Sequence, residues 1–241
     1  PRTRANNCNL VFHDFNTKRD RHLGVFPTGL QPYASLVPKN SPALDLSTVA
    51  VVVPVKAFDQ AKERLSDLLT PIERITLAKY CADRVIRAAS KFAVFVVCDD
   101  PIVAQWARDH NAKIVWQPNV GLNAAVHEGV RFVASLNKQL AIVAHSDLPL
   151  ATDFAHLIED QDVETLLTSV TLVPDRHKDG TNVMIVPTNV GFEFCYGKNS
   201  FSAHQQFAKT CGLSVRIFND SGLAVDIDTA DDLAVAQQLK N

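Results

Sequence analysis

Short apolar runs alternate along the chain with segments in which apolar residues recur at helical spacing. The run Thr48–Val55 is rich in β-branched residues, which is typical of a strand buried in a parallel sheet. Thr70-Pro71-Ile72-Glu73 combines a capping-box pattern with proline at the first helical position, so we expect a helix to begin there. In the first half of the chain, the pattern predicts strands at 48–55, 93–98, 113–116 and 140–144. It also predicts three helices: one that begins at residue 71, a short one that extends through Trp106, and one over 122–136.

The second half of the chain is richer in strand-like segments. We expect strands over 166–173, 183–187, 214–218 and 223–227, and helices near 199–210 and 230–239. Regular alternation of strands and helices in the first half predicts an α/β fold. The expected architecture is a single doubly wound domain, with a mostly parallel mixed sheet and helices on both faces.

The first 45 residues have a different pattern from the rest. They contain prolines at positions 27, 32, 38 and 42, and no periodicity lasts longer than about one helical turn. We therefore expect residues 1–45 to form an extension, either poorly structured or packed on the domain, and residues 46–241 to form the domain itself. The chain begins at Pro1 and its only methionine is Met184, so its natural start is expected to lie upstream.

Composition is that of an ordinary globular enzyme. The chain has 241 residues, is 46% hydrophobic and 21% charged, and carries a net charge of −2. This charge argues against a nucleic acid or a membrane surface as partner. No apolar stretch approaches the length of a membrane span, and the N-terminus has no signal-peptide core. The five cysteines have no CxxC spacing, so we expect a cytoplasmic protein without a zinc knuckle or a disulfide framework.

Two acidic motifs, far apart in the sequence, each follow a strand-like segment. His145-Ser146-Asp147-Leu148-Pro149 follows residues 140–144, and Asp226-Ile227-Asp228-Thr229 follows residues 222–225. Carboxylates at the carboxyl ends of strands in such a sheet lie where ligands bind, and Mg²⁺ prefers hard oxygen ligands together with phosphates. Asp147 and Asp226 are therefore the candidate metal ligands and catalytic residues, with Asp228 as a further ligand. The alternative is that Asp147 and Asp228 cap the helices that follow them.

Basic residues follow the first predicted strand in the pattern PVK-x5-K-x-RL. Lys56, Lys62 and Arg64 could meet the phosphates of a nucleotide, and Lys56 is also a candidate catalytic residue. The spacing matches neither a P-loop nor a GxGxxG motif, so side chains and metal would have to hold the phosphates. The alternative is a solvated basic loop.

Three polar turns complete the candidate site. Gly121-Leu122-Asn123 precedes a helix, and there Gly121 permits close backbone approach while Asn123 could bind a base or ribose. The turn Asp179-Gly180-Thr181-Asn182 places a small hydroxyl where an anionic substrate could bind. In Tyr196-Gly197-Lys198-Asn199-Ser200, Gly197 and Ser200 stand at a helix start, which favours phosphate or carboxylate binding. Each turn has a plainer alternative, a helix cap or a simple turn, and His204 in the following helix is more often a core or surface residue.

In this order, PVK-x5-KxRL, GLNxA, DLP, GTN, YGxxS-x3-H and DIDT-x-DDL resemble the CofC/FbiD family over residues 48–239. These are guanylyltransferases of coenzyme F420 biosynthesis, with a nucleotidyltransferase-type fold that is MobA-like and Rossmann-like. The resemblance implies transfer of GMP from GTP to phosphoenolpyruvate, 2-phospho-L-lactate or 3-phospho-D-glycerate, with release of pyrophosphate. It assigns the metal to Asp147 and Asp226, the GTP phosphates to Lys56, Lys62 and Arg64, the nucleoside to the Gly121–Asn123 loop, and the acceptor to Thr181, Gly197 and Ser200.

The sequence departs from the family pattern in places. Lys178-Asp179-Gly180-Thr181-Asn182 lacks one glycine of the usual GTGTN, and Ala230 replaces the usual proline of DTPxDL. These departures affect the choice of acceptor more than the class of reaction. Partners are expected to be small molecules, and a homodimer is an open option. The alternatives are another MobA-like nucleotidyltransferase, a glycosyltransferase that uses the DxD of residues 226–228, and a non-catalytic nucleotide-binding protein.

Overall fold

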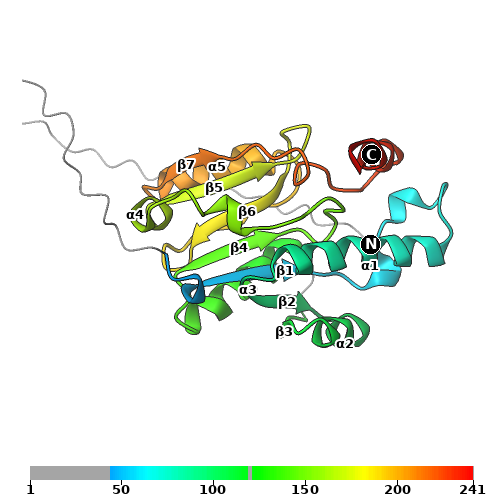
Figure 1. Ribbon diagram of the computed structural model, residues 1–241, viewed down its shortest axis with the longest axis horizontal. Coiled ribbons are helices and arrows are strands. Elements are labelled where there is room, and N and C mark those ends of the chain that lie inside the picture. Colours follow the sequence, from blue (N-terminus) through cyan, green and yellow to red (C-terminus); the bar gives the residue numbers. More distant parts are fainter. Residues whose placement is uncertain (1–43, 119–120, 241) are drawn as a thin grey trace, which may run out of the picture. The chain divides into compact units, whose positions relative to one another are not determined.

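The computed structural model describes residues 44–118 and 121–240. These residues belong to the unit Pro42–Asn241, while the expected extension, residues 1–45, lies almost entirely outside the described part. Within the described residues, seven strands form one sheet in the order β3-β2-β1-β4-β6-β5-β7 (Figure 1). The strands are β1 (Val49–Pro54), β2 (Ala93–Cys98), β3 (Lys113–Trp116), β4 (Leu140–Ala144), β5 (Ser169–Pro174), β6 (Thr181–Pro187) and β7 (Ser214–Ile217).

The sheet is mixed but mostly parallel. Strands β1 to β4 pair in parallel, β6 runs antiparallel to both β4 and β5, and β7 pairs in parallel with β5. Because β6 is reversed, its first residues lie beside the carboxyl end of β4, where Ala144 is opposite Val183. The loops after β1 and β4 and the start of β6 therefore meet at the carboxyl ends of the parallel strands, which we call the carboxyl edge of the sheet.

Helices cover both faces of this sheet, as predicted. They are α1 (Pro71–Ala88), α2 (Pro101–Asp109), α3 (Leu122–Ser135), α4 (Val163–Leu167), α5 (Ser200–Thr210) and α6 (Ala230–Lys240). Along β1, Val51 and Val53 pack in a core cluster with residues of α1 and α2, whereas Ala50 and Val52 pack with residues of α3 and α5. This alternation follows from the two-residue period of a strand, and it explains why β1 is apolar throughout.

Local sequence explains where several helices begin. The Thr70 side chain accepts from the Glu73 backbone N–H and the Glu73 carboxylate accepts from that of Thr70, so the predicted capping box is confirmed. Asp100 caps α2 through the N–H groups of Ile102 and Val103. Within the described residues, no helix is both long and apolar enough to cross a membrane.

Two of the predicted strands need correction. The segment from 223 to 227 has the alternating burial of a strand, with Leu223, Val225 and Ile227 buried, but it lies in irregular backbone. Residues 166 and 167 end helix α4, so the strand predicted from 166 begins at Ser169. In both cases apolar spacing indicates burial correctly, but the backbone hydrogen-bond partners that define a strand come from the fold.

Candidate active site

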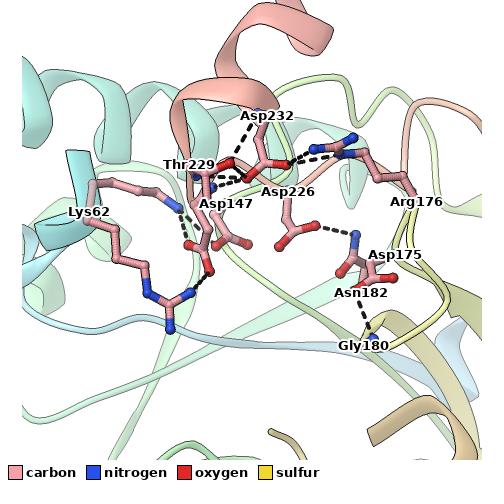
Figure 2. A network of polar contacts seen from close by, with 11 residues as sticks. Lys62, Asp147, Asp175, Arg176, Gly180, Asn182, Asp226, Thr229 and Asp232 are labelled. Carbon is pink, nitrogen blue, oxygen red and sulfur yellow. Dashed lines mark hydrogen bonds and ion pairs between the residues drawn. The ribbon is translucent and has the colours of Figure 1, made fainter. Parts of the chain in front are cut away.

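The centre of the candidate site is a buried lysine between two carboxylates. The Lys62 ammonium lies 2.9 Å from Asp147 Oδ2 and 3.5 Å from Asp228 Oδ1, with only 5% of its side chain exposed. Lys62 has a left-handed backbone, with φ of 58°, directly before a short 3-10 helix from Glu63 to Leu65. This turn aims the loop after β1 at the two acidic motifs, which confirms that residues distant in the sequence converge there (Figure 2).

The charges of this group depend on one another. Burial by itself raises the pKa of Asp147, but the Lys62 ammonium, with His145, more than offsets it and lowers that pKa below its usual range. Burial likewise disfavours charge on Lys62, and the carboxylates of Asp147 and Asp228 reverse this effect and raise the pKa of Lys62. At neutral pH both partners are therefore ionised, because each charge compensates the desolvation of the other.

Asp226 lies in a different environment within the same group. Its pKa is raised, first by burial and then by the nearby carboxylates of Asp147 and Asp228. Its Oδ1 accepts from Asn182 Nδ2 at 3.2 Å (Figure 2). The same amide donates to the Leu223 carbonyl at 2.9 Å. A carboxylate crowded by two others is one that a cation would stabilise.

Backbone contacts fix the two acidic motifs relative to each other. The N–H of Ile227, between the two aspartates of the DxD, donates to the Asp147 carbonyl at 3.2 Å. At the start of α6, Thr229 donates to Asp232 Oδ2 through both its N–H and its hydroxyl, each at 2.7 Å. Arg176 in turn holds the Asp232 carboxylate with N···O distances of 2.8 and 3.0 Å (Figure 2).

These contacts exclude the alternative that the Asp228 side chain caps the helix that follows it. Thr229 and Asp232 supply the side-chain hydrogen bonds at this helix start, and the Asp228 carboxylate instead contacts Lys62 and, at 3.6 Å, Arg64. Asp228 is therefore a member of the charged group and does not cap the helix with its side chain.

The oxygen donors of this group can be compared with the ligands that Mg²⁺ prefers. The donors of Asp147 and Asp226 are hard oxygens, and Asp147 Oδ1 is buried without a hydrogen-bond partner among the described residues. Within the described residues, however, no three His, Cys, Asp or Glu side chains are close enough together to hold a metal ion by themselves. The residues fit a Mg²⁺ ion held by one or two carboxylates with substrate phosphates and water as the other ligands, which is its usual mode in phosphate chemistry. The assignment of Asp147, Asp226 and Asp228 to metal stays a prediction.

A cavity of about 760 Å³ opens beside the charged group. Its wall is formed by the ends of β1 and β2, the loop after β4 and the start of α3, and it includes Lys56, Asp147 and Gly121. A second cavity of about 190 Å³ contains Lys56, Lys62, Asp147 and Asp228. The larger volume is within the range of small-molecule sites, and Lys56 and Asp147 border both cavities.

Thr181, Gly197 and Ser200, the three expected acceptor-binding residues, also lie near one another. We call them the acceptor-side residues. Thr181 begins β6 and Ser200 begins α5, and both are buried, whereas Gly197 is exposed with φ of 129°. Asp179 ties these elements together, because its carbonyl accepts from the Phe201 N–H at 3.0 Å and its carboxylate from that of Asn199 at 3.2 Å.

Two predicted nucleotide-binding residues make contacts that sequence patterns do not reveal. Arg64 is 76% exposed and contacts only the edge of the charged group, through Asp228. Asn123 Oδ1 accepts from the Tyr196 N–H at 2.6 Å, and its Nδ2 donates to the Tyr196 carbonyl at 3.2 Å. A role for either residue in binding nucleotide stays a prediction.

The structure adds residues that sequence reasoning missed. Asn182 supports Asp226, and Arg176 with Asp232 supports the segment that carries Asp226 and Asp228. Asn182 is the last residue of the GTN motif, so the motif was a usable signal for it. Arg176 lies in a polar loop without any pattern of its own, and only the fold brings it to Asp232.

A nucleotidyltransferase-type α/β sheet with acidic and basic side chains at its carboxyl edge defines the class. Solved structures with this fold include a putative nucleotide-diphospho-sugar transferase from Desulfovibrio desulfuricans, with a TM-score of 0.65 at 12% identity, covering 81% of this chain and 88% of that one. Another is 4-diphosphocytidyl-2C-methyl-D-erythritol synthase from Anaerococcus prevotii, with a TM-score of 0.54 at 11% identity, covering 81% of this chain and 97% of that one. At such identities the likeness shows the fold alone.

Sequence comparison identifies the family. The model of the family "Guanylyl transferase CofC like" matches residues 49–236. A phosphoenolpyruvate guanylyltransferase of Sphaerobacter thermophilus is 33% identical over 77% of this chain and 91% of its own length. One from Rubrobacter xylanophilus is 34% identical, over 78% of this chain and 92% of its own length. The chain belongs to the CofC-like guanylyl transferase family.

Proposed function

We propose that this protein transfers GMP from GTP to the phosphate of a three-carbon acid, with phosphoenolpyruvate as the first candidate, and releases pyrophosphate. The observation that carries this proposal is the group of Lys62, Asp147, Asp226 and Asp228 at the carboxyl edge of the sheet, beside a cavity large enough for a nucleotide. The names of the relatives in Sphaerobacter and Rubrobacter favour phosphoenolpyruvate as acceptor. The family places the reaction in coenzyme F420 biosynthesis, and 2-phospho-L-lactate and 3-phospho-D-glycerate are the competing acceptors.

The reaction that suits this site is a direct displacement. An oxygen of the acceptor phosphate attacks the α-phosphorus of GTP, a new P–O bond forms, and the bond to pyrophosphate breaks. A phosphate dianion is already a nucleophile, so the site needs no general base and no covalent intermediate. Its contribution is alignment of the two substrates and compensation of negative charge.

The residues have distinct parts in this proposal. Lys56, which lines both cavities, would contact the GTP phosphates, and Lys62 and Arg64 would add positive charge beside it. Gly121, at the start of α3, lets the nucleoside approach the backbone closely because no side chain occupies that place.

Asp147 would hold Mg²⁺ together with one second carboxylate, either Asp226 or Asp228. When bound, the ion would supply charge neutralisation for the phosphates. Asn182 keeps Asp226 oriented through the bond from Nδ2 to Oδ1. The acceptor-side residues would receive the three-carbon acid.

The proposal has a direct test. Pyrophosphate release would be measured with GTP, Mg²⁺ and each of the three acceptors separately, with ATP in place of GTP and with no acceptor as controls. We expect release with GTP and phosphoenolpyruvate and loss of that release on removal of Mg²⁺ by a chelator. Pyrophosphate release that does not depend on the acceptor, or no release with any of the three acceptors, would contradict the proposed function.

We further propose that the protein works in the cytoplasm on small-molecule substrates, because GTP and phosphorylated acids are the partners that this reaction needs. Its oligomeric state, including a homodimer, stays a prediction.

A further inference from the structure

Two helices on the same face of the sheet hold one short backbone segment, Cys195–Tyr196. From α3, Asn123 binds both backbone polar groups of Tyr196, as an acceptor at 2.6 Å and as a donor at 3.2 Å. From α5, His204 Nε2 accepts from the Cys195 N–H at 3.0 Å. The segment lies outside the helices and strands, so these side chains supply hydrogen-bond partners that a strand would otherwise provide. We call this arrangement the Cys195–Tyr196 clamp.

The hydrogen bonds of His204 fix its tautomer. Because a backbone N–H can only donate, Nε2 must be the accepting nitrogen, and a neutral ring then carries its proton on Nδ1. Nδ1 lies 3.0 Å from Thr181 Oγ1, to which it donates. Burial, with a smaller contribution from His145, lowers the pKa of His204 to about 4, so the ring is neutral at physiological pH.

Aromatic packing anchors the same segment. The ring of Tyr196 is edge-on to that of His204, with centroids 4.8 Å apart, and lies 5.0 Å from that of His145. Tyr196 is 9% exposed, and its hydroxyl is buried without a hydrogen-bond partner among the described residues. The segment is thus held by its backbone and by its side chain.

The clamp is connected to each acceptor-side residue. Gly197 directly follows Tyr196, and its carbonyl accepts from the Ser200 N–H at 3.1 Å. Ser200 opens α5, the helix that carries His204, and His204 binds Thr181 directly. On its other side the clamp reaches α3, whose N-cap Gly121 and first residue Leu122 border the large cavity.

We propose that Asn123 and His204 are positioning residues that hold the Cys195–Tyr196 backbone and thereby place the acceptor-side residues for the anionic acceptor. The inference rests on the proposed function, and it gives Asn123 a role at the acceptor where the sequence pattern suggests the nucleoside. A small displacement of substrate-binding groups costs a large factor in alignment, so loss of the clamp should weaken use of the acceptor. Use of GTP should be affected much less, because none of the three hydrogen bonds of the clamp involves a group on the cavity wall.

The Asn123→Ala variant separates the two roles. We expect the KM for phosphoenolpyruvate to rise by on the order of tenfold, with the KM for GTP within about twofold of wild type. His127→Ala is the matched control, because His127 lies one turn further along the same helix and is exposed. A rise in the KM for GTP with the acceptor KM unchanged would overturn the proposal in favour of a nucleoside contact, and so would a variant with both constants unchanged.

Variants of His204 test the other side of the clamp. His204→Gln keeps an amide within reach of the Cys195 N–H, whereas His204→Leu removes both hydrogen bonds. We expect the acceptor KM of the glutamine variant to lie nearer to wild type than that of the leucine variant. A purely structural role would lower the melting temperature of both and leave the acceptor KM of the folded protein unchanged, which would overturn the proposal for His204.

Amide hydrogen exchange examines the clamp without any turnover. The Tyr196 amide should exchange at least about tenfold faster in Asn123→Ala than in wild type, and the His127→Ala control should match wild type. If wild type released no pyrophosphate with any acceptor, the proposed function would fail and the role at the acceptor with it. An unchanged Tyr196 exchange rate in Asn123→Ala would refute the clamp itself, even if wild type turned over normally.

Discussion

At the scale of single residues, the site depends on compensation between buried charges. Lys62 stabilises the ionised form of Asp147, whereas burial and the neighbouring carboxylates raise the pKa of Asp226. A buried ion pair adds little net stability compared with apolar residues, yet removal of one partner leaves the other desolvated and uncompensated. The pair therefore makes the site sensitive to substitution and to pH.

Replacing Lys62 by methionine should destabilise the fold at neutral pH. The expected loss in free energy of unfolding is about 3 kcal/mol, because Asp147 loses its nearest cation. Burial then dominates and raises the pKa of Asp147, so the variant takes up a proton that wild type does not as the pH falls. The difference in stability should shrink between neutral pH and about pH 4.5, as measured by urea denaturation.

Lys209→Met, at an exposed lysine of α5, is the control for this prediction and should stay within about 0.5 kcal/mol of wild type. Mg²⁺ should also stabilise Lys62→Met more than it stabilises wild type, since a cation would replace the lost ammonium. A difference in stability that is constant with pH would argue against the coupling of Lys62 and Asp147.

His204 should make the protein less stable in mild acid. Burial lowers its pKa from the ordinary 6.5 to about 4 in the folded state, so the unfolded chain binds more protons between these values. Its contribution is complete above about pH 6.5 and is lost as the pH falls toward 4, by up to about 3 kcal/mol. Between neutral pH and about pH 4.5, wild type should therefore lose more free energy of unfolding than His204→Gln, which has no proton to bind. Equal losses in the two proteins would show that His204 is not buried in its neutral form.

At the scale of elements, the apolar pattern predicts most of the fold. The strands expected at 93–98, 113–116 and 140–144 are confirmed residue for residue, because short apolar runs between helical repeats leave little choice of strand boundaries. The pattern fails at 223–227, where alternating burial comes from packing of an irregular segment. Spacing along one chain reports which residues are buried, and it does not report which neighbour completes the hydrogen bonds.

The site could be predicted in part for the same reason. Asp147, Asp226 and Asp228 come to one edge because each motif follows a buried segment that leads there. The pairing of Lys62 with Asp147 and the clamp by Asn123 join residues 85 and 73 positions apart in the sequence. Such contacts depend on loop conformation, including the left-handed backbone of Lys62, for which the sequence has no glycine as a marker.

The packing of α3 on the sheet gives a test at this scale. A Cβ atom on Gly129 would lie 2.5 Å from Val52 Cγ1 and 2.7 Å from Val97 Cγ2, both on strands in the core. Glycine to alanine within a helix usually stabilises by about 1 kcal/mol, but overpacking of this contact costs about 1 to 3 kcal/mol. We expect Gly129→Ala to lower the melting temperature by a few degrees, about 2–4 °C per kcal/mol of net loss. A higher melting temperature in this variant would show that α3 can move away from the sheet.

At the scale of the whole molecule, the reversed strand β6 joins the two sides of the site. Its first residues bring Asn182 to Asp226 and Thr181 to His204, while the parallel strands β1 and β4 carry Lys56 and Asp147 toward the cavity. The two aspartates of the DxD contact different residues: Asp228 lies beside Lys62, and Asp226 accepts a hydrogen bond from Asn182. Under the proposed function, the sheet would have a nucleotide side and an acceptor side with the acidic group between them, which suits transfer between two bound substrates.

The central claim is that GMP moves from GTP to the acceptor phosphate at this group. The most direct measurement follows GTP labelled on its α-phosphate, incubated with the protein, Mg²⁺ and phosphoenolpyruvate, with identification of the labelled product by mass spectrometry. We predict that the label appears in a diphosphate linking guanosine to the three-carbon acid, and that Asp147→Asn reduces its formation by at least about a hundredfold. Label that remains in GTP, or appears only as GMP or GDP, would contradict the account.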